Sequence, residues 1–138
     1  MWWFYAILSA FFASLTAVFA KLGVAGISSN LATGIRTLVI LVLVWSIVFF
    51  RGEQKEISSI SKNAVIFLVI SGLATGLSWL FYFKALQAGN VSQVAAVDKL
   101  SVALTIVLSV IFLNETLSLK TAIGAALIIA GTLVLIKS

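Results

Sequence analysis

The chain has 138 residues, of which 62% are hydrophobic and only 9% are charged. A soluble domain carries charge on about a quarter of its residues, so this composition excludes a soluble protein and indicates one that lies in lipid. Neither cysteine nor histidine is present, which excludes disulfide frameworks, imidazole bases and the common zinc and haem sites.

Five apolar runs predict an all-α integral membrane protein with five transmembrane helices in a single domain, residues 1–138. A bilayer core of about 30 Å needs about 20 helical residues, and each run comes close to that length. The first run lacks the cleavage box of a signal peptide, so we expect it to be retained. Gly89-Asn90 divides the third run from the fourth, because both residues tolerate the positive φ of a tight turn. The expected helices are 2–21, 31–50, 64–88, 91–113 and 119–136.

Three charged residues, Arg36, Asp98 and Lys99, lie inside the second and fourth runs. A charge at bilayer depth costs about 2.5 to 3.5 kcal/mol on insertion scales, and such residues usually face a polar interior or a wet cavity. With five crossings, the turns after the first and third helices share one side, so these charges fall in one half of the membrane. In that half, basic side chains outnumber the one acidic side chain, Asp98, and this excess of positive charge favours an anionic ligand. Asp98 and Lys99 are about 100° apart around a helix, so we expect each to need a partner elsewhere.

The third helix brings further candidates toward the same half. Trp79, Tyr82 and Lys84 could line a binding cavity, although both aromatic residues also suit an interfacial belt and the lysine could snorkel to the headgroups. For Arg36, Asp98 and Lys99 the competing interpretation is a structural interhelical ion pair. Glu115 could instead cap the start of the fifth helix. The remaining candidates for substrate binding or coupling are Lys21, Ser101 and Glu115.

Small residues predict where helices pack closely. Gly72 and Gly76 form a GxxxG step in the third helix, and Gly124 and Gly131, seven residues apart, share one face of the fifth. Such steps are common in membrane bundles and are not specific for a function.

Motifs for enzymatic chemistry are missing. The sequence has no nucleotide loop, no Gly-x-Ser-x-Gly elbow and only four carboxylates, so we expect no enzyme activity, no metal site and no cofactor. The net charge of +5 comes from basic residues scattered singly between apolar runs. This scatter does not favour nucleic acid as a partner.

Three segments together resemble the EamA-like repeat of the drug/metabolite transporter superfamily. They are 82–92 (YFKALQAGNVS), 113–118 (LNETLS) and 124–131 (GAALIIAG). Within that resemblance, Arg36 looks like the basic residue of the repeat's second helix, and Glu115 matches the acid of its Leu-Gly-Glu turn. Two features depart from the pattern: Asn114 replaces the glycine, and the proline of the fourth helix is absent, which removes the usual basis for a kink there.

The resemblance implies one half of a ten-helix inverted-repeat transporter, in a bacterial or archaeal plasma membrane. Secondary transporters commonly bind substrate between two inverted repeats, and one five-helix unit has nothing to move against. We therefore expect an antiparallel homodimer. Flanking basic residues barely favour one orientation, with an amino terminus in the cytoplasm. Four lie on one side (Arg51, Lys55, Lys62, Lys120) and three on the other (Lys21, Lys84, Lys137).

The leading hypothesis for function is a secondary transporter that moves a small organic metabolite, with a carboxylate as the favoured charged group, by alternating access around Arg36, Asp98 and Lys99. Asp98 is the candidate for proton coupling. The alternative is a non-transporting membrane subunit, of a heteromeric transporter or of a flippase for a lipid-linked substrate. In either case the expected partners are the bilayer and a small molecule.

Overall fold

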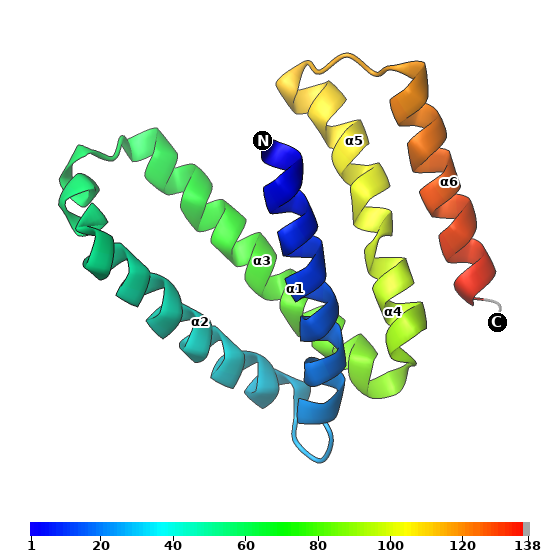
Figure 1. Ribbon diagram of the computed structural model, residues 1–138, viewed down its shortest axis with the longest axis horizontal. Coiled ribbons are helices and arrows are strands. Elements are labelled where there is room, and N and C mark those ends of the chain that lie inside the picture. Colours follow the sequence, from blue (N-terminus) through cyan, green and yellow to red (C-terminus); the bar gives the residue numbers. More distant parts are fainter. Residues whose placement is uncertain (137–138) are drawn as a thin grey trace. The chain divides into compact units, whose positions relative to one another are not determined.

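The computed structural model describes residues 1–136, and its elements in these residues are all helices (Figure 1). Five helical segments are long and apolar enough to cross a membrane, which confirms the predicted all-α membrane architecture. Lys137, counted above as a flanking charge, lies outside the described residues. The elements are α1 (Trp2–Gly23), α2 (Ser29–Arg51), the 3-10 helix η1 (Glu53–Ser59), α3 (Lys62–Ala88), α4 (Val91–Asp98), α5 (Leu100–Leu113) and α6 (Leu119–Ile136).

Serine residues begin three of these helices. The Ser28 hydroxyl accepts the Leu31 N–H at 3.2 Å, and the Ser61 hydroxyl accepts the Ala64 N–H at the same distance. Ser118 does the same for Thr121 at the start of α6, at 3.1 Å. A side-chain oxygen in this position satisfies one of the N–H groups that have no partner within the helix. The starts of these three helices are therefore determined by residues close to them in the sequence.

Left-handed backbone occurs at three turns in the described chain, at Gly26, Gly52 and Asn114. Asn114 ends α5 with φ 53° and ψ 31°, a conformation that costs little for glycine and is tolerated by asparagine. Asparagine can thus stand where the repeat usually has glycine. The predicted division at Gly89-Asn90 is present between α3 and α4, where Asn90 is extended with φ −72° and ψ 142° and does not use the positive φ that it tolerates.

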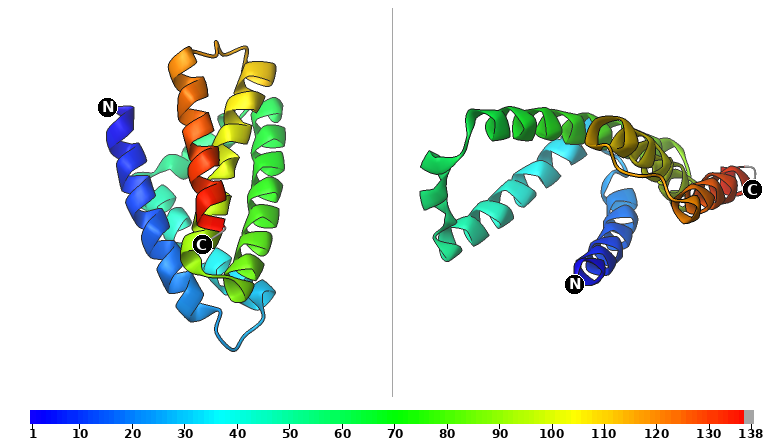
Figure 2. Two further views of the ribbon diagram at one scale, coloured as in Figure 1. Left: turned by 90° about the vertical axis from the view of Figure 1, so that its right-hand side faces the viewer. Right: turned by 90° about the horizontal axis from the view of Figure 1, so that it is seen from above.

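The chain forms two compact units, which are described separately. One comprises Met1–Phe19 and the chain from Ala88 onward; in it α6 packs against both α4 and α5, and both views of Figure 2 show α5 beside α6. The other comprises Ala20–Gln87, with Phe83 and Leu86 completely buried. Each unit holds a group of the predicted site residues.

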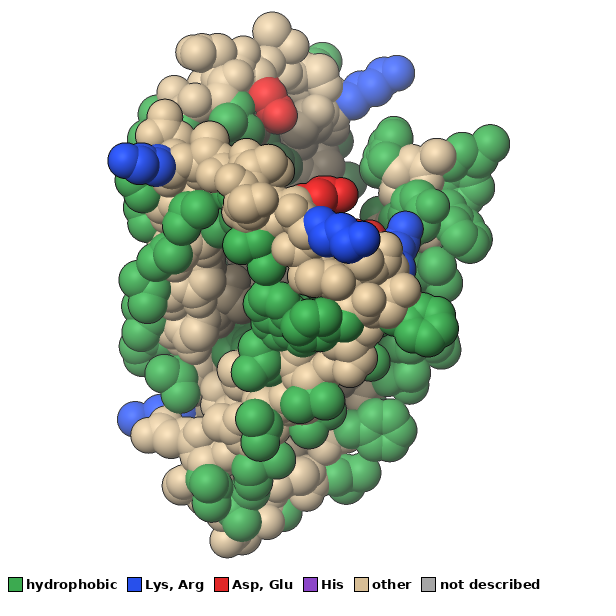
Figure 3. Space-filling view, turned by 90° about the vertical axis from the view of Figure 1, so that its left-hand side faces the viewer, with side chains coloured by type: hydrophobic (Ala, Val, Ile, Leu, Met, Phe, Trp, Pro, Cys, Tyr) green, Lys and Arg blue, Asp and Glu red, His purple; other side chains and the backbone are tan. Residues whose placement is uncertain are grey.

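Most large apolar side chains are exposed. Phe50 is 96% exposed and Leu119 is 78% exposed, and Figure 3 shows hydrophobic side chains spread along the helices with few charged ones among them. In water such a surface would be an aggregation liability, whereas in a bilayer the acyl chains cover it. The exposure is what a membrane-spanning chain requires.

The fourth span is broken. The sequence predicted one helix over 91–113, but α4 ends at Asp98 and α5 begins at Leu100, with Lys99 between them. Two backbone hydrogen bonds at this point span three residues, from the Lys99 N–H to the Ala96 carbonyl at 3.1 Å and from the Val102 N–H to the Lys99 carbonyl at 3.0 Å. A continuous α-helix has bonds that span four. The break arises without the proline that would ordinarily explain it.

Candidate functional site

Arg36 lies over two aromatic rings. It lies on α2, where its guanidinium carbon is 5.2 Å from the centroid of the Trp79 ring and 4.5 Å from that of Phe83, both on α3. A guanidinium over an aromatic face gains about 0.5 to 2 kcal/mol, more where water is excluded. Among the described residues, neither of the two ion pairs includes Arg36. The structure thus holds this cation against two aromatic rings and outside both ion pairs of the described residues.

The two aromatic partners lie one turn apart on α3. Residues four apart share a helix face, so Trp79 and Phe83 present neighbouring rings to Arg36. Trp79 was among the predicted site residues, whereas Phe83 was missed, and its spacing from Trp79 was the signal that could have found it. Tyr82 is half-buried, with its ring 6.0 Å from that of Phe83 and nearly perpendicular to it. The structure brings Arg36 and Trp79 together and adds Phe83.

Hydrogen bonds tie the end of α3 to the end of α1 and the loop that follows it. The Lys21 amine donates to the Leu86 carbonyl, and the Gln87 amide donates to the carbonyls of Val24 at 3.1 Å and Ile27 at 2.6 Å. These bonds place the carboxyl-terminal ends of α1 and α3 on one side, as the count of crossings predicted. A hollow of about 300 Å³ lies here, with Lys21 and Gln87 in its lining. The position of Lys21 is therefore explained by a structural bond.

We expect Gln87→Leu to lower the free energy of unfolding by about 1 to 3 kcal/mol, because it removes two hydrogen bonds that each contribute about 0.5 to 1.5 kcal/mol. Thermal unfolding of the detergent-solubilised protein measures this loss. Gln54→Leu is the matched control, since the Gln54 Oε1 is buried and has no partner among the described residues. An apolar side chain there should be neutral or stabilising. Equal losses in both variants would contradict the role given to the Gln87 bonds.

Asp98 and Lys99 form an ion pair with each other at the break in the fourth span. The Lys99 Nζ lies 3.4 Å from the Asp98 Oδ2, and the side chains are 58% and 38% exposed respectively. We expected each of these residues to need a partner elsewhere, and for the ion pair this is wrong, because the two neighbours reach each other. The pair is long and partly open, so both groups retain capacity for other partners.

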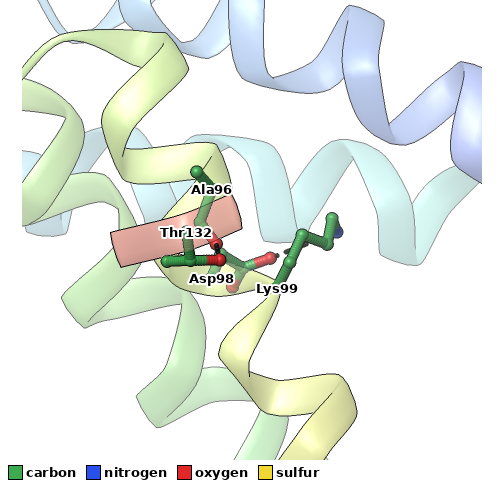
Figure 4. A network of polar contacts seen from close by, with 4 residues as sticks. All are labelled: Ala96, Asp98, Lys99 and Thr132. Carbon is green, nitrogen blue, oxygen red and sulfur yellow. Dashed lines mark hydrogen bonds and ion pairs between the residues drawn. The ribbon is translucent and has the colours of Figure 1, made fainter. Parts of the chain in front are cut away.

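The break also receives a hydrogen bond from α6. Figure 4 shows Thr132 beside Ala96, and the Thr132 Oγ1 donates to the Ala96 carbonyl at 3.1 Å. Only 3% of Thr132 is exposed. This residue was not predicted as part of a site, since a threonine in an apolar run gives no local signal of its partner.

Three other predicted residues are exposed. Lys84 is exposed on α3, and Ser101 is exposed in the first turn of α5. Glu115 is exposed in the link before α6, and the suggestion that it caps that helix is wrong, because Ser118 does so. Arg36 belongs to one compact unit and the Asp98–Lys99 pair to the other. Within residues 1–136, no three acidic side chains gather as metal ligands.

Arg36 and the Asp98–Lys99 pair differ in the chemistry that each can provide. The guanidinium of Arg36 presents five N–H donors in a plane and suits a carboxylate or phosphate. The Asp98–Lys99 pair lies where a membrane-spanning helix is interrupted, and its long contact leaves both groups able to accept other partners. Discontinuous helices of this kind form substrate and coupling-ion sites in secondary transporters.

Comparison with known proteins decides the family. The sequence profile described as the EamA-like transporter family matches residues 1–137. The chain belongs to the EamA-like transporter family. Together with the five apolar helices, this makes the EamA-like chain a multi-pass membrane protein with a transporter role.

Two relatives of the EamA-like chain are informative. It is 51% identical over 134 residues to a protein of Sinorhizobium sp. named "Uncharacterized transporter in cobO 3'region", a match that covers 97% of this chain and 95% of the relative. A protein of Methanocaldococcus jannaschii, named only as uncharacterized, is 32% identical over 83 residues, covering 60% of this chain and 61% of that protein. The bacterial relative indicates an inner-membrane location. No solved structure matches significantly.

Proposed function

We propose that this EamA-like chain is a secondary transporter for a small organic metabolite that carries a carboxylate, and that it works by alternating access in an antiparallel homodimer. The observation that carries the proposal is the state of Arg36. Its guanidinium is held by Trp79 and Phe83 inside a membrane-spanning helix, and neither ion pair of the described residues includes it. A cation kept at this depth without a carboxylate partner is suited to an anionic substrate.

The geometry of the stack favours a planar anion. The rings of Trp79 and Phe83 lie 5.2 and 4.5 Å from the guanidinium carbon, and the N–H donors of this group point outward in the guanidinium plane. A carboxylate can therefore accept two parallel hydrogen bonds at the edge of Arg36 without displacing Trp79 or Phe83. An apolar or aromatic part of the metabolite would pack against the same rings.

The broken fourth span supports transport over a static role. In secondary transporters, interrupted helices near the midplane expose backbone groups and charged side chains to substrate and coupling ions. Asp98 lies at such an interruption, with its carboxylate loosely paired to Lys99. We assign Asp98 the coupling role, in which it gains and loses a proton during the cycle.

Pairing of two five-helix units supplies the second half of the transporter. The relative from Sinorhizobium sp. has nearly the same length, because the match covers 95% of it. Beyond the nearby backbone of their own helix, Gly72 and Gly76 on α3, and Gly124 and Gly131 on α6, have no atom within 4 Å of where a Cβ would stand. These faces can admit the backbone of another helix. The near balance of flanking basic residues permits insertion in both orientations.

A ligand screen tests the proposal. The purified full-length protein is heated in the presence of organic acids, amino acids, nucleosides and sugars, since a ligand of the folded form raises the apparent Tm by mass action. We expect carboxylates to raise the Tm and the best of them to be taken up by proteoliposomes. Stabilisation by neutral compounds alone would refute the substrate class, and a single strict orientation of terminal tags would refute the antiparallel dimer.

A further inference from the structure

The break in the fourth span needs a cause that its own sequence does not provide. Sharp interruptions of a helix usually occur at proline, at glycine, or where a side chain inserts into the ladder of backbone hydrogen bonds. Residues 91–113 contain neither proline nor glycine. The cause must therefore come from outside the span.

Thr132 is placed to supply that cause. Its hydroxyl donates to the Ala96 carbonyl, which also accepts the N–H of Lys99 three residues later. In a continuous helix the Ala96 carbonyl would accept the N–H four residues later, that of Leu100. A donor from α6 on this carbonyl competes with the regular bond and favours the tighter one.

Other threonines of the chain behave differently. The hydroxyls of Thr33, Thr37 and Thr75 each donate to the carbonyl four residues earlier on their own helix, at 2.8, 2.9 and 2.9 Å. This is the usual bond of a threonine within a helix. Thr132 instead donates across to α4, and only 3% of it is exposed, so water cannot readily replace Ala96 as its partner.

We infer that Thr132 is a positioning residue, whose hydroxyl holds the fourth span in its broken form and thereby sets the Asp98–Lys99 pair. If the hydroxyl bond is lost, the span can close into one helix. The two side chains then separate by about 100° around that helix, and the ion pair opens. The consequence for coupling rests on the proposed transport function, whereas the effect on the break does not.

Interhelical hydrogen bonds in membranes set the expected size of the effect. Their measured contributions correspond to an equilibrium shift of about 3- to 20-fold. Loss of the Thr132 bond should raise the ratio of continuous to broken span by that factor. Because the chain has no cysteine, two introduced cysteines can report this ratio without background labelling.

The experiment uses spin labels on Ser92→Cys and Leu104→Cys of the full chain in lipid nanodiscs. These positions lie on α4 and α5, twelve residues apart, which corresponds to about 18 Å of rise in a continuous helix. Thr132→Val removes the hydroxyl and keeps the shape, whereas Thr132→Ser keeps the hydroxyl and removes a methyl group. We expect the distance distribution to move toward the continuous helix in Thr132→Val and to stay unchanged in Thr132→Ser.

Thr75→Val is the matched control, since it removes a hydroxyl that is bonded within its own helix, and it should leave the distribution unchanged. If Thr132→Val is not recovered folded, Thr132→Ala must show the same shift. An unchanged distribution in the variant without the hydroxyl would overturn the inference. So would an equal shift in Thr132→Ser, because that result would assign the effect to packing. Neither result depends on substrate, so the inference can fail while the proposed transport stands.

Discussion

Arg36→Gln is expected to weaken binding of a carboxylate substrate by about 10- to 150-fold, because a hydrogen bond to a charged group contributes about 1.5 to 3 kcal/mol. The glutamine side chain retains hydrogen-bonding groups but loses both the charge and the stacking on Trp79 and Phe83. The loss should appear in the ligand-induced rise in Tm and in the KM of uptake by proteoliposomes.

Arg36→Lys separates charge from geometry. Lysine keeps the positive charge but lacks the planar fork that binds a carboxylate through two bonds and stacks on aromatic faces. We expect an affinity between those of the original protein and Arg36→Gln. If lysine restores full binding, the charge alone is what matters and the aromatic stack has no role in recognition.

Arg51→Gln is the matched control for both variants. Arg51 ends α2 and pairs with Glu53 at 2.9 Å, with 69% of its side chain exposed. Exposed pairs of this kind contribute about 0 to 1 kcal/mol. Transport should remain near normal in this variant, and equal losses in Arg36→Gln and Arg51→Gln would point to general charge or folding in place of a site.

Asp98→Asn is expected to abolish accumulation of substrate against its gradient while leaving exchange of substrate across the membrane. Asparagine has nearly the shape of aspartic acid but cannot take up or release a proton, so the proton-dependent step is lost. Uptake should then lose its dependence on external pH. Proteoliposomes with an imposed pH gradient provide the measurement, alongside a counterflow assay for exchange.

Glu56→Gln is the corresponding control, because Glu56 lies in η1 between the second and third spans and is exposed. Its removal should change neither accumulation nor the pH profile. A pH profile in Asp98→Asn that matches that of the original protein would remove Asp98 as the coupling site, whatever the effect on rate.

The contacts of Arg36 with Trp79 and Phe83 could be predicted from the sequence only in part. Arg36 and Trp79 could be selected because a charge and an indole are unusual within apolar runs. Phe83 was missed because phenylalanine is common in apolar runs, and only its spacing of four residues from Trp79 could have indicated that it lies at Arg36, where it is completely buried. Gln87 was missed as well. Its partners are backbone carbonyls in the loop after α1, and because every residue has a backbone carbonyl, the sequence does not indicate which ones it bonds.

The sequence by itself determined that the chain lies in lipid, that it has five spans, that serine residues cap three of them, and that charged residues lie within apolar runs. Each of these depends on composition or on residues within one turn of one another. Only the tertiary structure decided what the charges contact and where the fourth span breaks. Thr132 bonds to a carbonyl 36 positions earlier, and no local pattern encodes that meeting, because it exists only once α6 packs against α4.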